Sequence, residues 1–245
     1  MKIKAIIDAD SILFKAALTT TSSRACRINL KDRLSEIEAF VFADERSLYI
    51  KAKGNYRNNI YPDYKANRKG KELDPDVSER LSDAYVYARE ELGGIGFDGL
   101  EADDLVCIDA YTTMQDPDTK GVICAIDKDM LQIPGVHFNF DKQLLLEQSE
   151  DAADLFYWSQ CIIGDGADNV PGIRGLGEAK TSKIMANSKL GSRHKIVADQ
   201  YQKKFGAAWQ DYFSQYCTSL WLCRDFEQSW DEWYATLSKD ISNEN

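Results

Sequence analysis

The chain has 245 residues, of which 44% are hydrophobic, enough for one large α/β core with a helical extension. Its net charge of -10 at pH 7 is unlike the basic surface of most nucleic-acid-binding proteins, although cations held by clustered acids would neutralise part of it. The six cysteines and two histidines lack zinc-site or Cys–His spacing, and no apolar run reaches membrane-helix length, so we expect a cytoplasmic protein with reduced thiols.

Strand and helix patterns alternate from the start of the chain. Residues 3–7, Ile-Lys-Ala-Ile-Ile, predict a buried strand that ends at Asp8, and a helix is expected to begin at about Ser11. Residues 38–42 predict a second strand, which would end near Asp44. Both strands would therefore place a carboxylate at their carboxyl ends.

The amino-acid composition changes after the second predicted strand. Residues 56–71 are dense in tyrosine and basic residues and poor in aliphatic ones, so we expect them to lie outside the core. A helix is predicted over 75–92, with Asp74 as its cap and proline at its first position. A second helix over 101–114 carries three acids in its first turn.

The second half begins with the most strand-like run of the chain. Residues 121–126 predict a central parallel strand that ends at Asp127. A helix over 151–163 is followed by a glycine-rich turn, another helix that ends at about Met185, and further helices. We therefore predict an α/β fold with a central, mostly parallel sheet flanked by helices, and a helical C-terminus.

Acidic residues recur where strands and tight turns are expected to end. Carboxylates at the carboxyl ends of parallel strands converge in the crevice above the sheet, where their repulsion favours bound cations. Oxygen-only ligands favour Mg²⁺ or Mn²⁺. The candidate metal ligands are Asp8, Asp44, Glu101, Asp103, Asp104, Asp127, Asp129, Asp165 and Asp168.

Two segments supply the chemistry of phosphate binding. In residues 61–69, tyrosines are interleaved with basic residues, a combination that stacks on bases and clamps phosphates. Residues 172–177, Gly-Ile-Arg-Gly-Leu-Gly, precede a helix and resemble a helix-hairpin turn, whose amides bind phosphate without reading sequence. The candidate DNA-binding residues are Tyr64, Lys65, Arg68, Lys69, Gly172, Arg174, Gly175, Gly177 and Lys180.

The ordered set of motifs resembles the structure-specific 5′ nuclease family, which includes flap endonucleases, the 5′-nuclease domain of DNA polymerase I and stand-alone phage exonucleases. The resemblance covers about residues 3–185 and is greatest to the phage-type members. It is carried by Ile-Ile-Asp8, Asp44, Tyr64-Lys-Ala-Asn-Arg68, Glu101-Ala-Asp-Asp104, Asp127-Lys-Asp129 and Gly-Asp165-Gly-Ala-Asp168-Asn, followed by the glycine turn.

The resemblance implies a role for each matching residue. The first metal would be held by Asp8, Asp44, Glu101 and Asp103, and the second by Asp127, Asp129, Asp165 and Asp168. Asp104 matches a position that is acidic in many members, and Asp10 lies outside the usual ligand set. Lys65 and Arg68 match the catalytic basic pair that contacts the scissile phosphate at the base of a helical arch. The glycines at 172, 175 and 177 match the helix-hairpin, which binds K⁺ in some members.

The implied domains are an α/β nuclease core over 1–160, with a short basic arch at about 56–94, and a region over 161–245 with the helix-hairpin and C-terminal helices. The implied activity is 5′→3′ exonuclease and structure-specific 5′ nuclease cleavage with two Mg²⁺ ions, or with Mn²⁺. The expected substrates are duplex DNA with nicks, 5′ ends or flaps, and RNA–DNA hybrids. We expect a monomer that acts in phage DNA replication in the host cytoplasm, without membrane contact.

Three other functions compete with this interpretation. Asp8-Ala9-Asp10 after a strand is also the nucleophile-and-acid pattern of haloacid-dehalogenase-type phosphatases. A PIN-type ribonuclease and a non-catalytic DNA-binding module are the other two. The phosphatase leaves the basic tyrosine segment unexplained, the ribonuclease leaves the helix-hairpin unexplained, and the binding module leaves the clustered acids unexplained.

Overall fold

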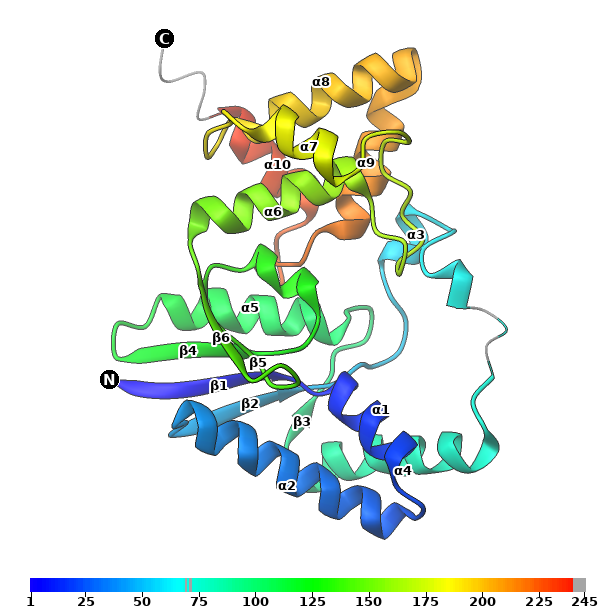
Figure 1. Cartoon of the computed structure of the whole chain (residues 1–245), viewed down its shortest axis with the longest axis vertical. Coiled ribbons are helices and arrows are strands. Elements are labelled where there is room, and N and C mark those ends of the chain that lie inside the picture. Colours follow the sequence, from blue (N-terminus) through cyan, green and yellow to red (C-terminus); the bar gives the residue numbers. More distant parts are fainter. Residues whose placement is uncertain (69, 71, 240–245) are drawn as a thin grey trace. The chain divides into compact units, whose positions relative to one another are not determined.

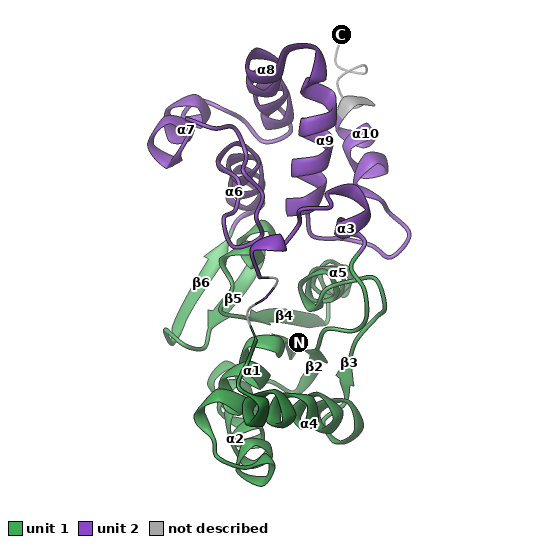
Figure 2. Cartoon of the chain, turned by 90° about the vertical axis from the view of Figure 1, so that its right-hand side faces the viewer, with its two compact units in different colours: residues 1–55, 71–148 green, residues 56–70, 149–245 purple. Residues whose placement is uncertain are grey.

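The computed structural model describes residues 1–68, 70 and 72–239, whose helices and strands are shown in Figure 1. They divide into two compact units, residues 1–55 with 71–148 and residues 56–70 with 149–245 (Figure 2). This division differs from the predicted boundary near residue 160. Residues 56–70 belong to the second unit because Arg57 donates hydrogen bonds to the carbonyl oxygens of Ser219 and Trp221.

The first unit is built on a six-stranded sheet. In spatial order the strands are β3 (Gly94–Ile95), β2 (Glu45–Tyr49), β1 (Lys2–Asp8), β4 (Thr119–Cys124), β5 (Gly135–Asn139) and β6 (Leu144–Gln148). Every neighbouring pair is parallel except β5 and β6, which are antiparallel. β1 and β4 lie at the centre, as their apolar runs predict, and the α/β fold with a mostly parallel sheet is confirmed.

Helices cover both faces of this sheet. They are α1 (Asp10–Thr19), α2 (Ser23–Val41), α4 (Pro75–Glu91) and α5 (Ala102–Met114), with the short η2 (Lys128–Gln132) after β4. Figure 1 shows α1, α2 and α4 on one face and α5 on the other. The predicted cap of α4 is confirmed, because the Asp74 carboxylate accepts the N–H groups of Asp76 and Val77.

The predicted strand at 38–42 is wrong, because these residues form the end of α2 and the residue that follows it. α2 buries Cys26, Leu30, Leu34, Ile37 and Val41, which recur every three or four residues and form one helical stripe. This helical period, kept over the length of α2, outweighs the local strand preference of Phe40, Val41 and Phe42. The second strand of the chain starts only at Glu45.

The second unit is helical. It contains α3 (Arg57–Ile60), η1 (Ala66–Arg68), α6 (Glu150–Ile163), α7 (Glu178–Met185), α8 (Arg193–Phe205), η3 (Gly206–Ala208), α9 (Trp209–Leu220) and α10 (Trp230–Lys239). Its core is aromatic and internally hydrogen-bonded: the Trp230 indole donates to the Tyr157 hydroxyl at 2.7 Å, and that hydroxyl donates to the Cys217 carbonyl at 3.0 Å. All six cysteines of the chain are buried free thiols, as predicted.

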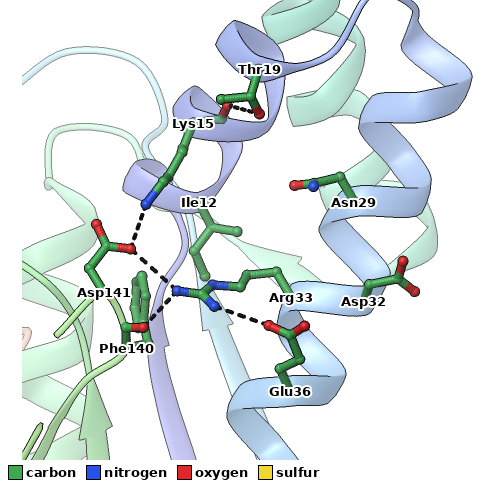
Figure 3. A pocket seen from close by; sticks show the side chains of 9 residues that line it. All are labelled: Ile12, Lys15, Thr19, Asn29, Asp32, Arg33, Glu36, Phe140 and Asp141. Carbon is green, nitrogen blue, oxygen red and sulfur yellow. Dashed lines mark hydrogen bonds and ion pairs between the residues drawn. The ribbon is translucent and has the colours of Figure 1, made fainter. Parts of the chain in front are cut away.

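Figure 3 shows a cleft of about 350 Å³ in the first unit, between α1, α2 and the turn after β5. Its lining residues are Ile12, Lys15, Thr19, Asn29, Asp32, Arg33, Glu36, Phe140 and Asp141. Lys15 and Arg33 both bind Asp141, at 2.7 and 3.3 Å, so the cleft's cations are already paired with a carboxylate. The cleft includes none of the predicted site residues.

Among the described residues, no helix is both long enough and apolar enough to cross a lipid bilayer.

Candidate active site

Asp8 occupies the carboxyl end of β1, as predicted, and its side chain is buried. Its Oδ1 atom accepts the N–H of Asp10 at 3.1 Å, which fixes the carboxylate at the junction between β1 and α1. β4 runs parallel to β1, with Ile7 opposite Cys124, so the residues that follow both strands share one edge of the sheet. This carboxyl edge is where ligands bind in open α/β sheets.

Asp10 lies at the same edge and connects three segments of the first unit. Its Oδ1 atom accepts the backbone N–H of Lys51 at 2.9 Å and the hydroxyl of Tyr85, on α4, at 3.0 Å. Burial raises the pKa of Asp10, the two hydrogen bonds oppose this shift, and the negative charge of Glu101 adds to it. Glu101 therefore lies within electrostatic reach of Asp10.

The first turn of α5 carries the three predicted acids in different environments. Asp104 is fully buried, and its Oδ2 atom accepts the N–H of Glu101 at 3.1 Å. It therefore caps the start of the helix and fixes the backbone at Glu101. Glu101 and Asp103 are only partly buried. We accordingly assign Asp104 a structural role at this turn, in addition to its predicted place among the acids.

Asp127 follows β4 at the carboxyl edge of the sheet. The side chain is exposed, and its Oδ1 atom accepts the N–H of Asp129 at 2.9 Å, so it caps η2. Asp129 is partly buried in the first turn of η2. The predicted position of this pair at the end of a central strand is therefore confirmed.

Asp44 does not lie at the carboxyl edge, and the prediction that it ends a strand is wrong. It precedes β2, where its N–H donates to the Ile3 carbonyl and its Oδ2 atom accepts the Ile3 N–H, both at 2.8 Å. Ile3 and Asp8 stand at opposite ends of β1, about 16 Å apart at a rise of about 3.3 Å per residue. Asp44 therefore cannot bind the same cation as Asp8.

Asp165 and Asp168 lie in the second unit, in the loop after α6. Asp165 is buried, and its Oδ1 atom accepts the N–H groups of Ala167 and Asp168 at 2.7 and 3.3 Å. These two hydrogen bonds form an Asx-type turn. Asp168 is paired with basic residues instead: its Oδ1 atom is 2.9 Å from Arg68 Nη2 and 3.6 Å from Lys65 Nζ.

The predicted basic segment, residues 61–69, lies against this loop, within the same unit. Lys65 donates its backbone N–H to the Asp168 carbonyl at 2.9 Å, and Arg68 donates through Nε to the Ala167 carbonyl at 3.2 Å. Tyr64 is only 3% exposed, so the predicted stacking of its ring on a DNA base is wrong. The predicted DNA-binding residue Lys69 lies outside the described residues.

Arg57 anchors the start of this segment and was missed by the sequence analysis, which placed residues 56–71 outside the core. It is 2% exposed, its guanidinium binds two carbonyl oxygens at the end of α9, and it lies 4.6 Å from the centroid of the Tyr56 ring. The Tyr-Arg pair is the sequence signal, because an arginine beside aromatic residues is often packed against their rings. Arg57 thereby connects the basic segment to the helical core.

We expect Arg57→Met to lower the free energy of unfolding of the second unit by about 2–4 kcal/mol, because it removes the guanidinium donor to the Ser219 carbonyl and leaves the Trp221 carbonyl only the longer bond from the Tyr56 hydroxyl. All five tryptophans lie in this unit, so their fluorescence during urea unfolding reports on it selectively. Lys204→Met, at an exposed site on α8 in the same unit, is the matched control and should change stability by less than about 0.5 kcal/mol. Equal stabilities of the two variants would contradict the anchoring role.

The glycine-rich turn before α7 contains glycines of two kinds. Gly172 is buried, and a Cβ atom there would lie 2.4 Å from the backbone nitrogen of Gly164, so this glycine is required for close packing of the turn. Gly175 and Gly177 are exposed, and a Cβ atom at either position would have no other atom within 4 Å. The candidate phosphate-binding surface of the turn therefore begins at Arg174, which is exposed.

Lys180 is exposed on the first turn of α7, and its ammonium group donates to the Gly175 carbonyl at 2.8 Å. With Arg174, it places positive charge beside the amino end of that helix. This arrangement agrees with the predicted contact to a phosphate backbone.

The candidate ligands offer oxygen atoms only, which suits a hard divalent cation such as Mg²⁺ or Mn²⁺. In the part of the chain that the structure describes, no three His, Cys, Asp or Glu side chains are already arranged to hold a metal ion. Like charges that repel one another lie apart until a cation joins them. The donor chemistry therefore fits the cation, and the exact ligand set stays a prediction.

A family model for the 5′-3′ exonuclease N-terminal resolvase-like domain matches residues 4–151. The chain belongs to this 5′-3′ exonuclease family. Its sequence is 27% identical over 209 residues to a 5′-3′ exonuclease of Bacillus subtilis (strain 168), covering 74% of this chain and 68% of that protein. It is 36% identical over 126 residues to an exonuclease of Escherichia phage T7, covering 51% of this chain and 41% of that one.

The fold is also similar to solved structures. A bacteriophage T5 D15 flap endonuclease, in a complex with DNA and metal ions, aligns with a TM-score of 0.72 at 15% identity, over 97% of this chain and 98% of that one. T5 5′-exonuclease with bound zinc aligns with a TM-score of 0.70 at 16% identity, over 99% of both chains. These structures are similar in fold. The family match decides against the phosphatase and the non-catalytic module, and the chain is a 5′-3′ exonuclease-type enzyme.

Proposed function

We propose that this 5′-3′ exonuclease hydrolyses phosphodiester bonds of duplex DNA at nicks, 5′ ends and flaps, with two divalent cations. The observation that carries this proposal is the carboxyl edge of the central sheet, where Asp8 and Asp127 follow neighbouring parallel strands. The further proposed ligands are Glu101, Asp103, Asp129, Asp165 and Asp168. Mg²⁺ is the proposed cation, and Mn²⁺ should replace it.

Different residues of the chain would have different roles in this reaction. Bound cations would activate a water molecule and neutralise charge that develops on the phosphate. Lys65 and Arg68 would bind the scissile phosphate and stabilise its negative charge in the transition state. Arg174 and Lys180 would hold the duplex through its backbone, without reading its sequence. The expected products carry a 5′-phosphate and a 3′-hydroxyl.

We propose further that the enzyme acts as a monomer in phage DNA replication, where RNA–DNA hybrids would be additional substrates. The similarity to the phage T7 exonuclease over half of this chain supports that setting. We also propose that a monovalent cation such as K⁺ binds at the glycine-rich turn of the second unit.

A substrate panel tests the proposed function. Nicked, blunt, flapped and RNA-primed duplexes, labelled at the 5′ end, should be cleaved in Mg²⁺, protected by EDTA and cleaved again when Mn²⁺ is added. A phosphomonoester such as p-nitrophenyl phosphate should not be hydrolysed. Cleavage that persists in EDTA, or activity on the phosphomonoester alone, would overturn the proposal.

The length of the proposed arch segment, at about 56–94, determines which substrate we expect the enzyme to prefer. Among the described residues between Arg68 and Glu101 there is one helix, α4, as the sequence predicts. Because a short arch cannot enclose a single strand, we expect stepwise degradation from nicks and recessed or blunt 5′ ends, and slow cleavage of long flaps. A bulky protein bound at the flap's 5′ end should change the rate little. Fast junction cleavage that this block abolishes would instead show that flaps are threaded.

A further inference from the structure

Tyr64 carries a polar contact that its predicted role does not explain. The side chain is 3% exposed, and its hydroxyl donates a hydrogen bond to Asp168 Oδ2 at 2.8 Å. The hydroxyl therefore points at a carboxylate of the neighbouring loop and is unavailable to a DNA base. A buried tyrosine whose hydroxyl meets a charged group makes one of the stronger kinds of hydrogen bond.

The two oxygens of Asp168 have separate neighbours. Tyr64 binds Oδ2, whereas Oδ1 is 2.9 Å from Arg68 Nη2 and 3.6 Å from Lys65 Nζ. The side chain of Asp168 is 13% exposed, while those of Lys65 and Arg68 are 21% and 54% exposed. The carboxylate is thus held from its inner side, and the cations that it orients remain accessible to a phosphate.

The backbone of the segment is held at the same point. Lys65 adopts a φ angle of 53°, in the left-handed region that lysine seldom occupies, and its N–H donates to the Asp168 carbonyl at 2.9 Å. Such a conformation persists only where surrounding contacts impose it, and it is often found at functional sites. Asp168 therefore fixes Lys65 through both its main chain and its side chain.

We propose that Tyr64 and Asp168 form a positioning pair that orients Lys65 and Arg68 toward the scissile phosphate. Tyr64 acts through Asp168 and these two basic side chains, and its hydroxyl touches no reacting atom. Electrostatic stabilisation depends on charges that are in place before the reaction starts, and loss of the Tyr64 hydroxyl would let the carboxylate and its two cations move. This inference rests on the proposed function, in which Lys65 and Arg68 bind that phosphate.

Tyr64→Phe tests the pair, because it removes one hydroxyl and leaves the buried ring. The expected result is a fall of about tenfold in the single-turnover rate on a nicked duplex, with DNA affinity, Mn²⁺ affinity and the urea midpoint close to those of wild type. Tyr212→Phe is the matched control from the same unit, because Tyr212 is exposed on α9, outside the basic segment, and its hydroxyl makes no hydrogen bond among the described residues. It should cleave at the wild-type rate.

A double-mutant cycle separates positioning from other roles. In an Arg68→Ala, Lys65→Ala background, Tyr64→Phe should cause less than a twofold further loss, because the charges it positions are gone. A wild-type rate for Tyr64→Phe, or a full additional tenfold loss in that background, would overturn this inference. Neither result affects the proposed function, which fails only if the wild-type protein does not cleave DNA or cleaves it in EDTA.

Discussion

Asp127→Asn is expected to reduce cleavage of a nicked duplex by at least about 100-fold in Mg²⁺, while duplex binding stays within a few-fold of wild type. Asp127 follows β4 at the edge where Asp8 follows β1, so its charge would contribute to holding a cation. Asparagine keeps the oxygen that accepts the Asp129 N–H, and the turn should therefore keep its structure. Steady-state cleavage and fluorescence anisotropy measure the two quantities.

Asp118→Asn provides the matched control for this charge change. Asp118 is exposed and immediately precedes β4, at the opposite end of the same strand from Asp127. The Asp118→Asn variant should therefore cleave DNA at the wild-type rate. If Asp127→Asn also turns over normally at ordinary Mg²⁺ concentrations, Asp127 is not a ligand.

Lys65→Ala and Arg68→Ala should each slow the chemical step by about 100-fold, with a much smaller effect on DNA affinity. Both side chains lie beside Asp168, at 3.6 and 2.9 Å, so their positions are set before substrate arrives. Loss of a charge that stabilises only the transition state lowers the rate more than it lowers the affinity. Single-turnover kinetics and equilibrium binding separate the two effects.

Lys204→Ala is the control for the loss of one positive charge. Lys204 is exposed on α8, in the same unit but outside the basic segment. Its rate should equal that of wild type. An unchanged single-turnover rate in Lys65→Ala and Arg68→Ala, with weaker binding alone, would make the two residues ordinary phosphate contacts.

Local sequence patterns determined the strands and helices with strong, short-range signals. Residues 3–7 are mostly apolar, and they form β1, in which Ala5, Ile6 and Ile7 are buried before the strand ends at Asp8. Asp74 and Pro75 define the start of α4 because the carboxylate satisfies free N–H groups and proline needs no hydrogen-bond acceptor there. The order of the acidic motifs likewise identified the enzyme family without knowledge of any distance.

The tertiary structure decided which of these residues can act together. Asp44 sits in a sequence that looks like a strand end, but the parallel register of β2 with β1 places it at the opposite edge from Asp8. Pairing between distant segments sets that register, and no local pattern encodes it. Asp10, outside the predicted ligand set, lies at the Asp8 edge because Lys51 and Tyr85 bind its carboxylate there.

The same reasoning applies to the basic segment. Its composition indicated cationic side chains that could bind phosphate, and this stays a prediction. Tyr64 was expected to contact DNA, but its hydroxyl donates a hydrogen bond to Asp168 in the loop after α6. Gly172 was expected to bind phosphate. Its structural role is different: the backbone at Gly164 passes so close to it that a side chain would not fit. Residue types therefore determined the chemistry available to this protein, and contacts between residues about 100 positions apart decided which side chains are free to perform it.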